Sequence, residues 1–134
     1  MSPDEGEILR WLEKAHHDRR VTELALAHKP PITDVAAFHA QQAVEKLLKA
    51  YLVYRREPFE KIHDLEELIN RCLPHDPAFA GLRERVSALT PYAVRFRYPG
   101  PGDPTVEQVR SALSVVNEVW TFVAGRIPVD LQGN

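Results

Sequence analysis

Apolar residues recur every three or four positions along most of this chain, which is the spacing of an amphipathic helix. The most regular stretch follows Asp103-Pro104, a helix-start signal, and its apolar positions are Val106, Val109, Leu113, Val116, Trp120, Val123 and Ile127. A second stretch follows Pro30-Pro31, with apolar positions at Ala37, Ala40, Val44, Leu47, Leu48, Tyr51 and Leu52. The prolines lie between such stretches, because proline is poorly tolerated inside a helix. The pattern predicts five helices, at about 3–28, 33–56, 64–72, 76–89 and 103–127.

The two shorter helices carry their own apolar faces, at Leu65, Leu68, Ile69 and Cys72 and at Phe79, Leu82, Val86 and Leu89. No convincing alternation of period two appears, and the segment from Tyr92 to Tyr98 is expected to be an ordered connection rather than a strand. We therefore expect an all-α fold, an antiparallel up-and-down helical bundle of about five helices, three long and two short. A single domain is expected over residues 3–127, followed by a loose C-terminal tail at 128–134.

Composition narrows the class of protein further. The chain has 134 residues and a formal net charge of −2, which excludes a globally basic nucleic-acid coat but not a local basic patch. Its one cysteine cannot form an intramolecular disulfide, and no apolar run approaches the roughly 20 residues of a membrane span. The acidic start is not that of a signal peptide. These features predict a cytoplasmic protein with no membrane association.

Common catalytic and metal-binding motifs are missing. The sequence has no Gly-rich phosphate loop and no H-E-x-x-H. His16 and His17 are adjacent, so on a helix they point about 100° apart and cannot chelate one ion together. Cys72 falls on the apolar side of its helix, which favours a core position over a nucleophile. We expect no metal and no cofactor.

A row of polar residues remains on the helix 33–56 once its apolar face is set aside. It consists of His39, Gln42, Lys46 and Lys49, whose offsets of 3, 7 and 10 place them along one side of the helix. The simplest interpretation is a solvated face, with Glu45 and Lys49 as an i,i+4 pair. The same row would suit a polar cleft or a self-association face.

Two further segments carry candidate chemistry. His63 lies at the expected start of the helix 64–72, where it can cap that helix or bond to a neighbouring loop. The segment 90–100 combines Arg95 and Arg97 with Tyr92, Phe96 and Tyr98, and it has no acidic residue. Arginine recognises phosphate and aromatic rings stack on bases, so this segment suits a nucleotide or a flexible single strand. The alternative is a loop docked on the bundle, with Tyr92 and Phe96 buried.

Taken together, Phe38–Ala50, His63-Asp64-Leu65 and Arg95–Gly100 resemble the HEPN family, and the resemblance extends over roughly Ile8 to Val123. HEPN domains are small helical bundles first named for suspected nucleotide binding. The resemblance implies a homodimer and a minimal nucleotidyltransferase partner, and such pairs can act as toxin and antitoxin. Other members are metal-independent ribonucleases that use an arginine and a histidine separated by four to six residues near the start of the last long helix.

This chain departs from that ribonuclease pattern, because its last histidine is His75. The resemblance therefore implies a non-catalytic HEPN module that binds a nucleotide, or RNA, or a nucleotidyltransferase and that partner's substrate. In the expected nucleotide site, Arg95 and Arg97 contact phosphate, and Tyr98 or Tyr92 stacks on or borders the base. Lys46 and Lys49 extend the positive surface, and His39 and Gln42 contribute hydrogen bonds. The alternatives are a ribonuclease toxin with a non-standard active site and a purely structural dimerising subunit.

Overall fold

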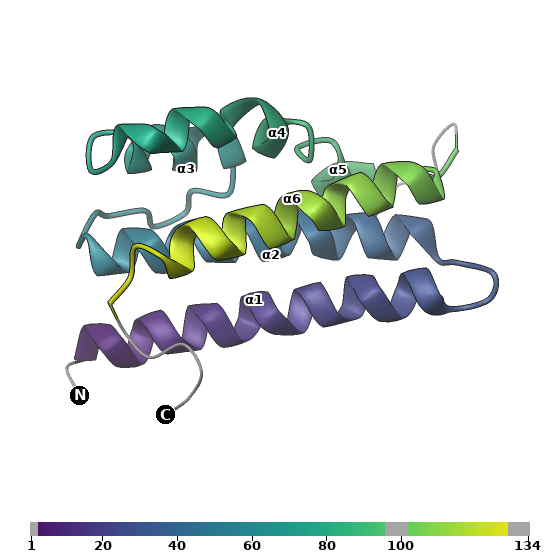
Figure 1. Ribbon diagram of the computed structural model, residues 1–134, viewed down its shortest axis with the longest axis horizontal. Helices are drawn as coiled ribbons and strands as arrows, with labels where there is room; N and C mark the ends of the chain where they lie inside the picture. The colour runs from purple at the N-terminus through teal and green to yellow at the C-terminus, as the bar shows by residue number, and fades with distance from the viewer. Residues whose placement is uncertain (1–2, 96–101, 129–134) are drawn as a thin grey trace.

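The computed structural model describes residues 3–95 and 102–128, which are helical apart from turns and connections. The elements are α1 (Pro3–Ala27), α2 (Thr33–Tyr54), α3 (Leu65–Cys72), the 3₁₀ helix η1 (Pro77–Leu82), α4 (Arg83–Ser87), α5 (Tyr92–Arg95) and α6 (Val106–Ala124). Three of them are long and lie side by side, as Figure 1 shows. The predicted all-α bundle with three long helices is confirmed.

Helix α2 is the centre of the bundle and contacts α1, α3, α5 and α6. All seven apolar positions predicted for it are buried. Alanines on this helix, including Ala36 and Ala40, are fully buried, and their small side chains let α1 approach closely. The Thr22 hydroxyl of α1 donates a hydrogen bond of 2.8 Å to the carbonyl of Ala36. The two helices therefore form a tightly packed antiparallel hairpin (Figure 1).

Helix α6 lies against α2 and runs in the same direction (Figure 1). It begins at Val106 rather than at the predicted Asp103-Pro104, because Thr105 is the N-cap. The Thr105 hydroxyl accepts from the backbone of Gln108 at 3.1 Å, and the Gln108 side chain accepts from the backbone of Thr105 at 2.8 Å, forming a capping box.

The buried face of α6 is rotated from the predicted one. The residues buried on it are Val109, Ala112, Val116, Val119 and Val123. Leu113 and Trp120, predicted to belong to the apolar seam, are only half-buried. Ala112 and Val119 are buried in their place. The indole of Trp120 lies beside α1, where the guanidinium of Arg19 is 4.4 Å from the ring centre.

The helix predicted from Asp76 to Leu89 is divided into η1 and α4. Its start is as predicted, since the Asp76 carboxylate accepts a 2.9 Å hydrogen bond from the backbone of Ala78. Gly81 lies near the change from 3₁₀ to α geometry. Glycine is unfavourable inside an α-helix, which is consistent with the interruption at this point. The predicted apolar face is kept, because Phe79, Leu82, Val86 and Leu89 are all buried.

The connection predicted at Tyr92–Tyr98 begins as a single helical turn, α5, which packs against α2. Its later residues, 96–98, and the predicted tail beyond Pro128 lie outside the described residues. In the described ranges, no helix has both the length and the apolar character needed to cross a membrane.

Candidate functional site

Two residues of the predicted polar row on α2 meet one carboxylate of α1. His39 Nδ1 lies 2.8 Å from one oxygen of Asp18, and the Lys46 ammonium donates to the other oxygen. Asp18 is only 7% exposed. The row at these two positions is thus an interhelical polar contact and not a solvated face.

A second cluster of the same composition lies nearby on α2. Oε2 of Glu45 is 2.9 Å from the Lys49 ammonium and 3.0 Å from Nδ1 of His63. Glu45 and Lys49 are buried, and the Lys49 ammonium lies 5.4 Å from the ring centre of Trp11 and 5.8 Å from that of Phe59. The predicted Glu45–Lys49 pair is therefore present, but inside the protein and beneath aromatic rings.

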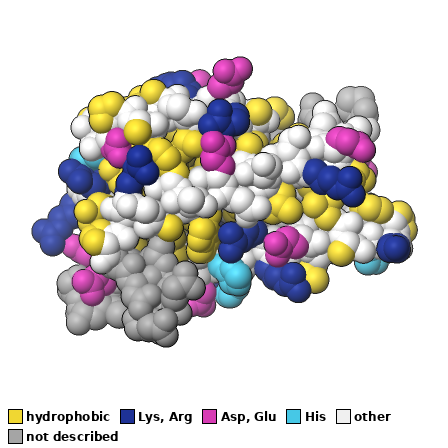
Figure 2. All heavy atoms as spheres, in the orientation of Figure 1, with side chains coloured by type: hydrophobic (Ala, Val, Ile, Leu, Met, Phe, Trp, Pro, Cys, Tyr) yellow, Lys and Arg dark blue, Asp and Glu magenta, His cyan; other side chains and the backbone are white. Residues whose placement is uncertain are grey.

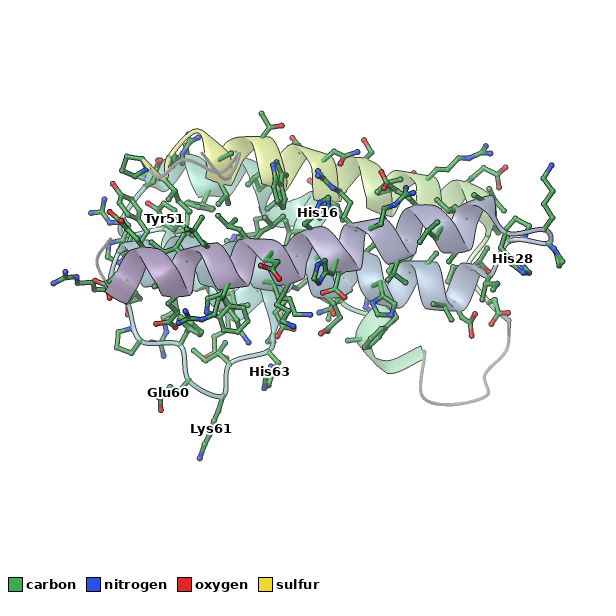
Figure 3. All side chains as sticks on the ribbon, turned by 90° about the horizontal axis from the view of Figure 1, so that it is seen from below. His16, His28, Tyr51, Glu60, Lys61 and His63 are labelled. Atoms are coloured by element: carbon green, nitrogen blue, oxygen red, sulfur yellow. The ribbon has the colours of Figure 1, made fainter. Side chains whose placement is uncertain are left out.

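Each cluster combines a carboxylate, a lysine and a histidine. In both, the carboxylate is close to Nδ1 of the ring, so a proton on Nδ1 would leave Nε2 as a hydrogen-bond acceptor. His63 is mostly exposed, and Figure 3 shows it on the side of the α1–α2 pair away from α6. These are oriented histidines, which is the arrangement a general base requires.

The charges within these clusters are balanced. Lys46 is paired with Asp18 and Lys49 with Glu45, so the positive surface expected of the two lysines is offset by acids. Gln42, which lies between His39 and Lys46 on the row, donates a 2.7 Å hydrogen bond to the side chain of Gln41. Attraction of phosphate by this row would require one of the lysines to leave its acid.

The helix start near His63 is capped by another residue. The Asp64 carboxylate accepts from the backbone of Glu66 at 2.9 Å, so Asp64 is the N-cap of α3. His63 takes neither of the two predicted roles, because its Nδ1 lies 3.0 Å from the carboxylate of Glu45 on helix α2 and not against a neighbouring loop. Sequence reasoning missed Asp18 as a partner because it lies 21 residues from His39, and no local pattern connects the two.

Tyr92 belongs to a different part of the molecule. It is buried in α5 and lines a pocket of about 410 Å³ between the α4–α5 segment and α6. At the rim of this pocket, the Arg85 guanidinium holds both oxygens of Glu118, at 2.7 and 2.5 Å. These hydrogen bonds lower the pKa of the Glu118 carboxyl and raise that of Arg85.

The predicted binding residues whose side chains the structure describes do not share one pocket. None of His39, Gln42, Lys46 and Lys49 lines the pocket that contains Tyr92. Arg95 is the last residue of α5, one helical turn after Tyr92. Its side chain, together with Arg97 and Tyr98, lies outside the described residues. In the described residues, no group of three histidine, cysteine or carboxylate side chains could hold a metal ion.

The comparisons with known proteins agree on one family. The sequence profile of the HEPN domain matches residues 8–127. The chain belongs to the HEPN domain family. A crystal structure of an archaeal HEPN homologue superposes with a TM-score of 0.72 over 95% of this chain and 99% of the other, at 19% sequence identity. A search of curated proteins gives no match.

This HEPN domain lacks the histidine that the family's ribonuclease pattern places in the last long helix. Arg110 is exposed on α6, and the chain has no histidine after His75. The histidines that are oriented by carboxylates, His39 and His63, lie on α2 and just before α3 instead. Any acid–base chemistry in this chain would thus use residues different from the family pattern.

Proposed function

We propose that this HEPN domain is a non-catalytic nucleotide-binding module that acts, as a homodimer in the cytoplasm, with a minimal nucleotidyltransferase partner. Such a pair would function as a toxin–antitoxin system. The observation that carries the nucleotide assignment is the position of Tyr92, which lines a 410 Å³ pocket one helical turn before Arg95. A pocket of this size is suited to a small ligand.

The arginines of the segment after Tyr92 would supply the phosphate contacts. Arg95 and Arg97 follow Tyr92 by three and five residues, and guanidinium groups bind phosphate oxygens in pairs. Tyr92 or Tyr98 would border the base. The phosphates would have to draw Lys46 or Lys49 away from its acid before the row on α2 could contribute to binding. The row, which also contains His39 and Gln42, would therefore contribute less than the arginines.

Calorimetric titration of the purified protein with nucleoside mono-, di- and triphosphates tests the assignment. Arg97→Ala is expected to weaken binding by about 1–3 kcal/mol, the scale of a hydrogen bond to a charged group. Arg20→Ala, which removes an exposed arginine that pairs with Glu23 at 3.4 Å, is the matched control. Equal affinity of both folded variants for every nucleotide would exclude the role of Arg97.

The partner assignment is tested by native mass spectrometry of the protein isolated gently from its own host. A dimer with a bound nucleotidyltransferase or a retained nucleotide is the expected result. A bare dimer would remove the support for a stable partner and favour the purely structural alternative when the titrations also show no binding.

A specific observation favours a second candidate, a metal-independent ribonuclease with a non-standard site. His39 and His63 are both held through Nδ1 by carboxylates, which suits acid–base chemistry at Nε2. RNA cleavage by the purified protein in the presence of a chelator, lost in His39→Asn or His63→Asn and kept in His17→Asn, would establish it. Intact RNA under these conditions is the result expected of the non-catalytic module.

A further inference from the structure

Helix α6 carries a second stripe of side chains beside the apolar one that it buries. Val106, Leu113 and Trp120 recur every seven residues, and each is only half-buried. Arg110 and Asn117 lie between them and are exposed, so the five positions follow one another at steps of four and three residues. Such steps place all five side chains, here called the α6 stripe, along one side of the helix. The stripe is about 21 Å long at 1.5 Å per residue.

An arginine of α1 is held at the C-terminal end of the α6 stripe. The Arg19 guanidinium lies 4.4 Å from the ring centre of Trp120 and donates a 3.3 Å hydrogen bond to the side chain of Asn117. The ring of His16 meets the same indole edge-on, with 6.4 Å between the ring centres. Stacking fixes the plane of the guanidinium, whose N–H donors all lie in that plane. Arg19 is thus oriented and keeps donors for a carboxylate.

The positive charges of this surface are not neutralised by the chain itself. In the part of the chain that the structure describes, no carboxylate lies within ion-pair distance of Arg19 or Arg110. Glu118, an acid on the same helix, is paired with Arg85. A ligand that covers the α6 stripe would therefore combine apolar groups with acidic groups that meet these two arginines.

The surroundings of the stripe favour a protein over a nucleic acid as that ligand. Figure 2 looks onto the face that α6 and α1 share, where hydrophobic side chains lie among separate positive and negative ones. Among the residues described, the positive side chains on this face do not join into the continuous basic surface that a long polyanion requires. Tryptophan and arginine, by contrast, are enriched at the centres of protein–protein interfaces.

We propose that the α6 stripe is a docking site for an acidic amphipathic helix of a partner protein. Apolar side chains of that helix, spaced by three and four residues, pack on Leu113 and Trp120. Its carboxylates meet Arg110 and Arg19. A helix fits because two packed helices match one another through stripes of this spacing. The docking site shares no residue with the α2 row or with the pocket at Tyr92, and it does not depend on nucleotide binding.

A pair of synthetic peptides tests the proposal. Both are amphipathic helices of three heptads with leucine at a and d, and they carry either glutamate or lysine at e and g. In NMR spectra of the isotopically labelled protein, the acidic peptide is expected to shift the backbone signal of Leu113 and the indole signal of Trp120, but not the indole signal of Trp11. The basic peptide should bind at least about tenfold more weakly, because it places ammonium groups beside two arginines.

Matched variants locate the docking site. Arg19→Met is expected to weaken binding of the acidic peptide by about tenfold or more. Its control is Arg20→Met, which removes an arginine of α1 that pairs with Glu23 and should bind as the unmodified protein does. Leu113→Glu should abolish binding, because it places a charge in the middle of the stripe. Ser111→Glu adds the same charge at an exposed position of α6 outside the stripe and should retain binding.

The proposal is overturned if the acidic peptide causes no shift at about millimolar concentration, if both peptides bind equally, or if Arg19→Met binds as Arg20→Met does. It is also overturned if the unmodified protein sediments as a dimer and Leu113→Glu, still helical by circular dichroism, as a monomer. In that case a second copy of the chain covers the stripe. Arg19→Met removes no core side chain, so it decides the charge requirement even where Leu113→Glu fails to fold.

Discussion

The ammonium of Lys49 lies 2.9 Å from the carboxylate of Glu45, and both side chains are more than nine-tenths buried. An i,i+4 pair of this kind on a helix surface stabilises the helix by only a few tenths of a kcal/mol, roughly 0.3–0.5. Here the pair is enclosed by α1 and the segment before α3, with Trp11 and Phe59 near the ammonium. Burial changes the consequence of losing one partner, because the remaining charge can no longer be solvated.

Lys49→Met is therefore expected to destabilise the protein by about 3–5 kcal/mol, the cost of leaving a buried charge unpaired. Glu45→Leu/Lys49→Met should recover most of this loss, because it replaces the whole pair by apolar side chains. Urea denaturation of the single and double variants measures both effects. Lys14→Met, on the exposed side of α1, is the control and should change little. Additive losses in the double variant would show that the two groups do not act as a pair.

Asp18 joins α1 to α2, and we expect its substitution to destabilise the protein. Its two oxygens accept from His39 and Lys46, and Asp18→Asn would replace one acceptor by a donor facing one of them. We expect a loss of about 2–3 kcal/mol in the free energy of unfolding, on the scale of hydrogen bonds to charged groups. The comparison is Glu23→Gln on the same helix, which removes only an exposed pair with Arg20. Similar stabilities of the two variants would assign Asp18 no special part in joining α1 to α2.

The apolar spacing was sufficient to predict the interior of α2 and α3. Ala37 and Leu48 are buried as expected, and so are Leu65 and Cys72, because the helical period alone decides which side of such a helix faces the core. On α6 the same spacing predicted that Trp120 belongs to the buried face, whereas Trp120 is half-buried and the neighbouring Val119 is fully buried. Apolar residues occupy two adjacent faces of α6, and the period cannot decide between them before α2 is in place.

The candidate site was less accessible to sequence reasoning. The sequence placed His39 and Lys46 on one side of α2, but Asp18, the carboxylate that they contact, comes from another helix. The burial of Asp18 follows only from the packing of α1 against α2. The pocket at Tyr92 depends on α4 and α5 both lying against α6. Contacts between segments distant in sequence leave no local periodic signal.

Cys72 is expected to be chemically inert in the folded protein. Burial raises the pKa of its thiol, with a smaller contribution from the charge of Glu57, and the thiolate is the form that reacts. A thiol-specific chromogenic disulfide at about pH 8 should react with the native protein more than about a hundredfold more slowly than with the urea-unfolded chain. Equal rates would place Cys72 at an accessible position and contradict its location in the core.

Asp76 is expected to make the free energy of unfolding depend on pH in the acid range. Its carboxylate accepts from the backbone of Ala78 at 2.9 Å and from the guanidinium of Arg126 at 2.6 Å, joining the start of η1 to the chain just after α6. These hydrogen bonds, that of Ala78 foremost, hold the pKa of Asp76 below its ordinary value. A carboxyl with a lower pKa when folded binds a proton more readily when unfolded. Its contribution is therefore complete above its ordinary pKa of about 4 and is lost as the pH falls through the folded value.

Asp76→Asn should accordingly be less stable than the unmodified protein near neutral pH, and the difference should shrink below about pH 4. Urea denaturation at about pH 7, 5 and 3 measures the difference at each condition. Arg126→Met removes one of the two causes and keeps the Ala78 hydrogen bond, so its own stability should retain part of the pH dependence that Asp76→Asn loses. Parallel curves for Asp76→Asn and the unmodified protein across this range would mean that the ionised form of Asp76 is not favoured by folding.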